Sequence, residues 1–163
     1  MKTIYQSTLG TIAILIFLIN TGCSKGGDSS TTPTPTTSKV TLLTSSDWGI
    51  AGIQHKAVSA SVWTDDYAGL TACVKDNKVV YRANGTYESN EGATKCNPSD
   101  PQILETGTWS LTTNETILVV QATNGNQIYN ATIETLTTNS LIISFTKVDA
   151  SNVTQQYKYS FSH

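Results

Sequence analysis

The sequence predicts an all-β domain, most simply an antiparallel up-and-down barrel of about eight strands. Thr, Ser and Asn are abundant, whereas Leu, Glu, Lys and Ala are too sparse for a helical bundle. Turn-forming residues recur every eight to fifteen positions through the second half of the chain, and short β-branched and aromatic runs lie between them. A sandwich of two sheets is the alternative that these observations leave open.

Nine runs have the length and composition of strands. Two of them alternate clearly, with Leu141, Ile143 and Phe145 on one face of the first and Tyr157, Tyr159 and Phe161 on one face of the second. Such alternation predicts strands with one buried and one solvated face. One helical turn is expected at residues 66–71. The predicted strands are 47–56, 58–64, 78–83, 86–90, 107–112, 116–122, 127–136, 140–147 and 154–162.

Cys73 and Cys96 form an even pair of cysteines that predicts a disulfide if the protein is exported. Asn84-Gly85 lies between them and is a strong signal for a two-residue hairpin loop. With that loop, paired residues sum to 169, which places Cys73 opposite Cys96. A pair of metal-binding thiols is the alternative, but no further Cys or His lies nearby.

The N-terminus has the pattern of an export signal. Lys2 precedes an apolar run at residues 9–19, which is too short to cross a bilayer as a helix. Gly22 stands directly before Cys23, so the segment resembles a lipobox, although Asn20 occupies a position where an aliphatic residue is usual. We expect cleavage of a signal peptide at residues 1–22 and lipidation of Cys23. Ordinary signal cleavage beside an unmodified cysteine is the alternative.

Residues 23–39 contain Ser, Thr, Gly and Pro and scarcely any apolar side chain, so they predict a disordered tether. The folded domain is then expected at residues 40–163. The residues that follow Cys23 resemble the tags that send lipoproteins of Bacteroidetes to the cell surface. The expected location is therefore the cell envelope, on the outer membrane and facing outward, with the membrane as partner through the lipid.

Charge and motif content exclude several classes of function. Removing residues 1–22 takes away Lys2 and leaves nine basic against twelve acidic side chains, so nothing favours nucleic acid. Asp65 and Asp66 are adjacent, and adjacent side chains on an extended chain point to opposite faces, which is unsuitable for an acid–base pair. His55 stands alone in its predicted strand and is expected at the surface or the barrel rim, not as a base or a metal ligand. We find no catalytic motif and expect neither enzyme activity nor a cofactor or metal ion.

Six short motifs stand out, at Trp48-Gly49 and at residues 73–77, 83–87, 91–96, 107–111 and 133–141. As a set they resemble the lipocalin-like domains carried by lipoproteins of Bacteroidetes. The resemblance implies a small barrel with an apolar cavity and does not imply a particular ligand. The first strand of true lipocalins carries Gly-x-Trp, whereas residues 46–48 lack that glycine.

The sequence has three tryptophans, whose large side chains could pack in the core or contact a ligand. The resemblance implies that Trp48 plugs one end of the barrel, and Trp109 is expected in the core. Trp63 and Tyr67 are the candidates for ligand contact, although packing in the core is the favoured interpretation of Trp63. The first functional hypothesis is a barrel that binds a small apolar or amphipathic molecule. It would fail for a barrel interior that is filled by Trp, Leu and Phe and has no cavity above about 300 Å³. The second is an accessory protein whose outer face meets a protein or glycan partner.

Overall fold

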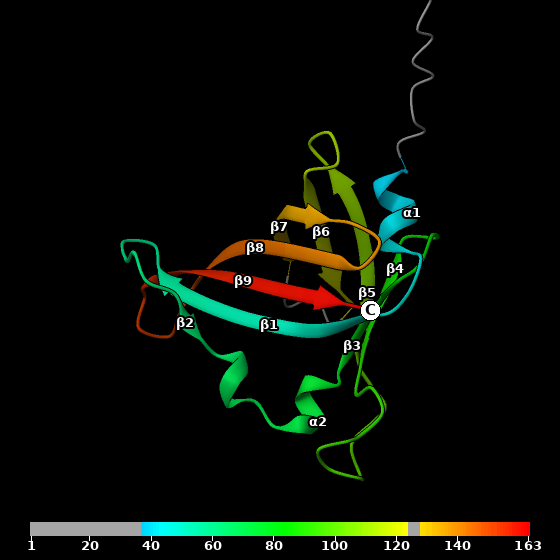
Figure 1. Cartoon of the computed structure of the whole chain (residues 1–163), viewed down its shortest axis with the longest axis horizontal. Helices are drawn as coiled ribbons and strands as arrows, with labels where there is room; N and C mark the ends of the chain where they lie inside the picture. Colours follow the sequence, from blue (N-terminus) through cyan, green and yellow to red (C-terminus); the bar gives the residue numbers. More distant parts are fainter. Residues whose placement is uncertain (1–36, 124–127) are drawn as a thin grey trace, which may run out of the picture. The chain divides into compact units, whose positions relative to one another are not determined.

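Eight antiparallel strands close into a barrel in the computed structural model, which describes residues 37–123 and 128–163 (Figure 1). The predicted signal peptide, Cys23 and most of the predicted tether lie outside the described residues. The barrel strands are β1 (Trp48–Ala57), β3 (Lys78–Tyr81), β4 (Thr86–Asn90), β5 (Ile103–Thr112), β6 (Ile117–Ala122), β7 (Ile128–Leu136), β8 (Ser140–Val148) and β9 (Thr154–Ser162). Pairing of β1 with β9 closes the ring and confirms the predicted fold class.

Alternating side chains build the interior as the sequence predicts. Leu141 pairs with Phe161 and Ile143 pairs with Tyr159 across β8 and β9. Leu141, Ile143 and Phe161 are all buried. Because successive side chains of a strand point to opposite faces, this register directs one set of each strand into the barrel.

One end of the barrel is plugged by Trp48 and covered by the short helix α1 (Lys39–Leu43). Trp48 and Leu43 are both 0% exposed, and the indole Nε1 of Trp48 donates to the carbonyl oxygen of Leu43 at 2.9 Å. The ring of His163 lies 3.9 Å from that of Trp48, so the last residue also covers this end. Trp48 and Trp109 are thus both in the core, as expected. Helix α1 was not predicted, and it begins at Lys39, the last residue of the predicted tether.

The predicted strand at 58–64 is wrong, because only β2 (Thr64–Asp65) is extended and paired there. β2 pairs with Gln54 and His55 on the edge of β1 opposite to β9, and it is not one of the eight barrel strands. Val58 and Val62 are 55% and 76% exposed, so no apolar surface covers this segment. Without a buried face, the β-branched residues have nothing to hold them in a sheet.

The predicted helical turn at 66–71 is present in part, as a 3₁₀ turn η1 (Tyr67–Gly69), and is followed by α2 (Ala72–Lys75). This segment runs beside β1 where β1 and β3 diverge, since only Trp48 and Gly49 of β1 pair with β3 (Figure 1). The Tyr67 hydroxyl donates to the Ile50 carbonyl at 3.3 Å. The segment therefore covers a seam that the sheet leaves open.

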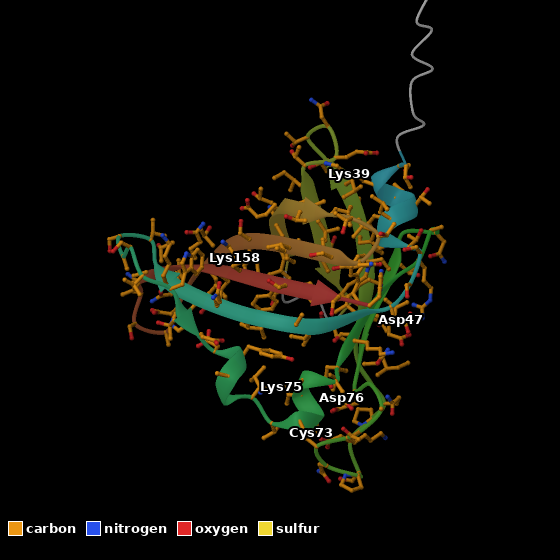
Figure 2. All side chains as sticks on the ribbon, viewed as in Figure 1. Lys39, Asp47, Cys73, Lys75, Asp76 and Lys158 are labelled. Atoms are coloured by element: carbon orange, nitrogen blue, oxygen red, sulfur yellow. A yellow bond between two sulfur atoms is a disulfide. The ribbon has the colours of Figure 1, made fainter. Side chains whose placement is uncertain are left out.

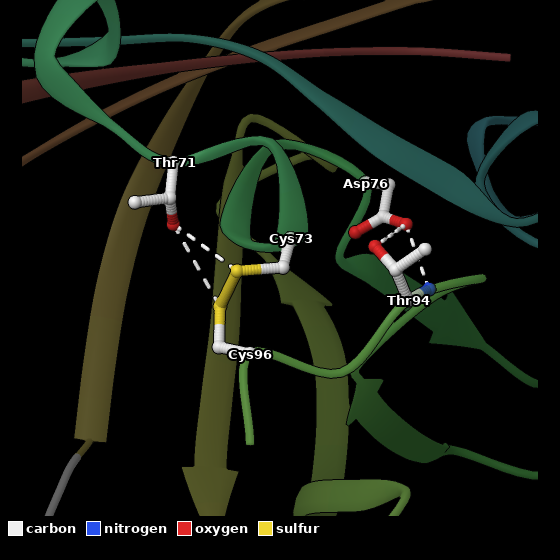
Figure 3. The surroundings of a disulfide bond; sticks show 5 residues. All are labelled: Thr71, Cys73, Asp76, Thr94 and Cys96. Atoms are coloured by element: carbon white, nitrogen blue, oxygen red, sulfur yellow. Dashed lines mark hydrogen bonds between the residues drawn. A yellow bond between two sulfur atoms is a disulfide. The ribbon is translucent and has the colours of Figure 1, made fainter. Parts of the chain in front are cut away.

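The disulfide between Cys73 and Cys96 is present, although the register that predicted it is wrong. Residues of β3 and β4 pair with sums of 168, as in Tyr81 with Tyr87. The hairpin loop has three residues and ends on Gly85, whose φ of +82° suits glycine, so the ladder shifts by one position. Cys73 lies in α2 and bonds to the connection between β4 and β5 (Figure 3).

Near this disulfide, Gly92 packs directly against the backbone of Asp76. Asp76 accepts from the backbone NH and hydroxyl of Thr94 at 2.8 and 2.7 Å, which holds the β4–β5 connection against α2 (Figure 3). A Cβ at Gly92 would lie 1.9 Å from the carbonyl oxygen of Asp76, and its φ is +64°. Only glycine satisfies both conditions.

We expect Gly92→Ala to lower the free energy of unfolding by about 2 kcal/mol or more, because both the backbone conformation and the contact resist a side chain. Gly69→Ala is the matched control, since a Cβ there meets nothing within 4 Å. Urea denaturation of both variants measures the difference. Equal stability of the two variants would contradict the close approach of Gly92 to Asp76.

Candidate ligand-binding site

The barrel interior holds a cavity of about 220 Å³. All eight barrel strands contribute to it, so it is a feature of the closed barrel and not of one loop. Five strands contribute two residues each at alternate positions, as the pleat requires. The lining consists of Ile50, Val79, Tyr81, Tyr87, Ser89, Glu105, Val120, Tyr129, Ala131, Ile143, Phe145, Tyr159 and Phe161.

Aromatic rings form one wall of the cavity. Phe145 lies edge-on to Tyr129 and to Tyr159, with ring centroids 5.3 and 5.4 Å apart. Phe145 also stacks on Tyr157 at 5.5 Å. Edge-to-face packing of this kind stabilises the wall beyond the area it buries and holds the rings in place before a ligand arrives.

The polar groups of the cavity gather around Glu105. The Tyr87 hydroxyl donates a hydrogen bond to the Glu105 carboxylate. Burial, and then the hydrogen bond and charge of Glu105, raise the pKa of Tyr87. Burial and the charge of Glu105 also raise the pKa of Tyr129. These tyrosines therefore stay neutral over the physiological range and offer hydroxyl groups within an otherwise apolar lining.

The size of the cavity limits what it can hold. At about 220 Å³ it is smaller than the 300 Å³ that the ligand-binding hypothesis called for, and that expectation is wrong. A cavity of about 150 Å³ is enough for benzene. A second pocket of about 150 Å³ shares Tyr129, Phe145 and Tyr159 and adds Lys147 and Tyr157. The site fits a molecule somewhat larger than benzene, with room to extend past Tyr157.

Neither predicted ligand residue lines the cavity. Trp63 is half-buried, with the Nζ atoms of Lys56 and Lys158 at 5.1 and 4.8 Å from its ring centroid. Figure 2 shows Lys158 on β9. Tyr67 is in η1, where the Nζ of Lys75 lies 4.9 Å from its ring centroid. Both aromatic rings therefore lie in the segment that follows β1 and contact lysine side chains of this chain.

His55 is a partly exposed residue of β1, and it has a carboxylate neighbour that the sequence did not predict. Its Nδ1 lies 2.6 Å from Oδ2 of Asp66. Asp65 is used differently, since its Oδ1 accepts from the backbone NH of Ala68 at 3.2 Å. The two aspartates thus separate, as expected, and one pairs with the histidine. Residues 37–123 and 128–163 contain no cluster of three or more His, Cys, Asp or Glu side chains that could hold a metal ion.

Sequence reasoning missed Glu105 because the predicted strand began at residue 107, whereas β5 begins at Ile103. The missed part carries exposed Ile103 and Leu104, and Glu105 interrupts any simple apolar alternation. Tyr87 and Tyr129 could have been found from the alternation of their strands once the barrel was assumed. The contact between Tyr87 and Glu105 needed the register of β4 and β5, which pairs Tyr87 with Gly107.

A closed antiparallel barrel, plugged at one end and hollow within, defines this molecule as a small-ligand-binding type of fold. The family profile described as "Lipocalin-like domain" matches residues 56–143, more than half of the chain. The chain therefore belongs to the lipocalin-like domain family. No curated protein matches it in sequence. No helix among the described residues has the length and apolarity needed to cross a membrane.

Proposed function

We propose that this protein is a lipid-anchored lipoprotein of the cell envelope whose barrel binds a small apolar or amphipathic molecule without catalysing a reaction. The observation that carries the proposal is the mainly apolar cavity inside the closed barrel. Trp48 and α1 close one end, so a ligand would enter at the other. Membership of the lipocalin-like family supports the same role.

Native mass spectrometry of the full-length protein, purified from its own envelope, is the direct test. We expect a retained molecule in the wild type and none in Ala131→Phe, because Ala131 is 1% exposed, lines the cavity and would place a ring in it. Thr132→Phe is the control, since the neighbouring side chain is exposed. A wild type that retains nothing, and shows no affinity for small aromatic probes, would refute ligand binding.

The anchor is proposed from Cys23 and the apolar run before it, in the manner of envelope lipoproteins of Bacteroidetes. Several acyl chains on one residue would hold the domain at the outer membrane, whereas a single chain binds marginally. We expect radiolabelled palmitate to enter the wild type and not Cys23→Ala. Protease treatment of intact cells would then test the proposed outward orientation. Equal labelling of both proteins would exclude lipidation at Cys23.

A partner-binding role is the second candidate, and one surface favours it. Two connections, β1–β2 and β8–β9, lie together, since the NH of Val58 donates to the Thr154 carbonyl at 3.1 Å. These connections and the end of β8 expose four valines, each between 43% and 76% accessible: Val58, Val62, Val148 and Val153. Contiguous exposed apolar side chains are typical of interaction sites.

A further inference from the structure

One charged side chain lines the cavity among the described residues. The other twelve lining residues are apolar or carry neutral hydroxyls, and Glu105 alone brings a carboxylate. Glu105 is half-buried, so solvent screens its charge less than at the surface. A lone charge in an apolar binding site points to the charge of what the site binds.

The protein supplies only part of what this carboxylate can accept. An ionised carboxylate has about four acceptor sites, and the Tyr87 hydroxyl occupies one of them on Oε1. Within residues 37–123 and 128–163, Arg82 forms an ion pair with Glu88 and His55 contacts the carboxylate of Asp66, and neither contact involves Glu105. A ligand cation would therefore find acceptor oxygens and an uncompensated negative charge.

The aromatic wall favours the same kind of ligand. Six of the lining residues are aromatic: Tyr81, Tyr87, Tyr129, Phe145, Tyr159 and Phe161. The face of an aromatic ring attracts an organic cation, and this attraction strengthens when the cation is desolvated. A carboxylate beside several ring faces thus matches an ammonium group better than an alcohol or an acid.

From this geometry we propose that the cavity selects a small organic ammonium ion, a protonated amine on a short apolar body, with the ammonium group at Glu105. The inference rests on the proposed ligand-binding function and names its ligand class. At about 220 Å³ the cavity accommodates a phenyl ring with a short chain. An amine-bearing head and an apolar body also make the ligand amphipathic.

Lys147 is the positively charged residue that lines the adjoining pocket, and it does not oppose the assignment. It lines the adjoining pocket beside Tyr157 and not the cavity itself. Its side chain is exposed, so water and salt screen its charge. The selectivity of the inner cavity is therefore set by Glu105.

Isothermal titration of the full-length protein in lipid nanodiscs, with empty nanodiscs as the blank, tests the inference with three probes of similar shape. They are 2-phenylethylamine, 2-phenylethanol and phenylacetate. We expect the amine to bind roughly ten-fold more tightly than the alcohol, and phenylacetate to bind most weakly, because a hydrogen bond to a charged group exceeds a neutral one. In Glu105→Gln the affinity for the amine should fall to that for the alcohol.

Glu115→Gln is the matched control, because it removes the same charge from an exposed side chain outside the cavity. It should keep the preference for the amine. Equal affinity for amine and alcohol in the wild type would overturn the ammonium assignment while the barrel remains a ligand carrier. Failure of all three probes to bind would overturn the assignment and count against the proposed function. The wild-type comparison decides the matter even if Glu105→Gln does not fold.

Discussion

Replacing Trp48 by alanine should lower the free energy of unfolding by about 4 kcal/mol. Trp48 is 0% exposed and fills the closed end of the barrel, so its removal leaves a cavity that the surrounding strands cannot refill. The change also leaves the Leu43 carbonyl without the indole donor, and a buried acceptor without a partner costs more. Urea denaturation followed by far-UV circular dichroism measures the loss.

Trp63→Ala is the control for this prediction. Trp63 is half-buried beside Lys56 and Lys158, and its loss removes cation–π contacts at the surface and no core packing. We expect a loss of about 1 kcal/mol. If Trp48→Ala were no more destabilising than Trp63→Ala, the end plug would not be part of the stable core.

Replacing both Cys73 and Cys96 by alanine is expected to lower the free energy of unfolding by about 3 kcal/mol. The bond closes a loop with a sequence separation of 23, and its removal restores conformational freedom to the unfolded chain. In the folded state it joins α2 to the β4–β5 connection beside the seam between β1 and β3. Thermal or urea unfolding of the variant and the wild type gives the difference.

A reducing agent separates this effect from a packing effect. It should destabilise the wild type by a similar amount and leave the double variant unchanged. Since neither cysteine lines the cavity, the variant should still bind the small aromatic probes at temperatures where it is folded. A double variant as stable as the wild type would mean that Asp76 and Thr94 hold this connection without help from the disulfide.

The strands were largely predictable because their signal is local. Alternation of β-branched and aromatic side chains identifies a strand wherever one face is buried, which is why β8 and β9 match expectation so closely. The same rule failed at residues 58–64, where Val58 and Val62 lie in solvent. Composition cannot tell whether a neighbouring element will cover a β-branched run.

Register and closure depended on the conformation of single residues. Asn84-Gly85 indicates a hairpin, but a three-residue loop ending on Gly85 shifts every pair of β3 and β4 by one position. The cysteines meet nonetheless, because α2 carries Cys73 to the β4–β5 connection that holds Cys96. The disulfide prediction was therefore correct although the predicted register was wrong. The even number of cysteines predicts a disulfide independently of the turn geometry.

The amino-acid sequence was sufficient for the kind of fold and the pairing of the cysteines, because hydrophobic alternation and cysteine number are properties of the chain alone. The core position of Trp109 was also expected, whereas the place of Trp48 at one end of the barrel was implied by the resemblance to lipocalin-like domains. Lipidation of Cys23 stays a prediction from the same source. The cavity, its small volume and the place of Glu105 beside Tyr87 came from tertiary packing. Eight strands must close with one register before their inward side chains enclose a space, and no local pattern encodes how much of that space the side chains leave empty.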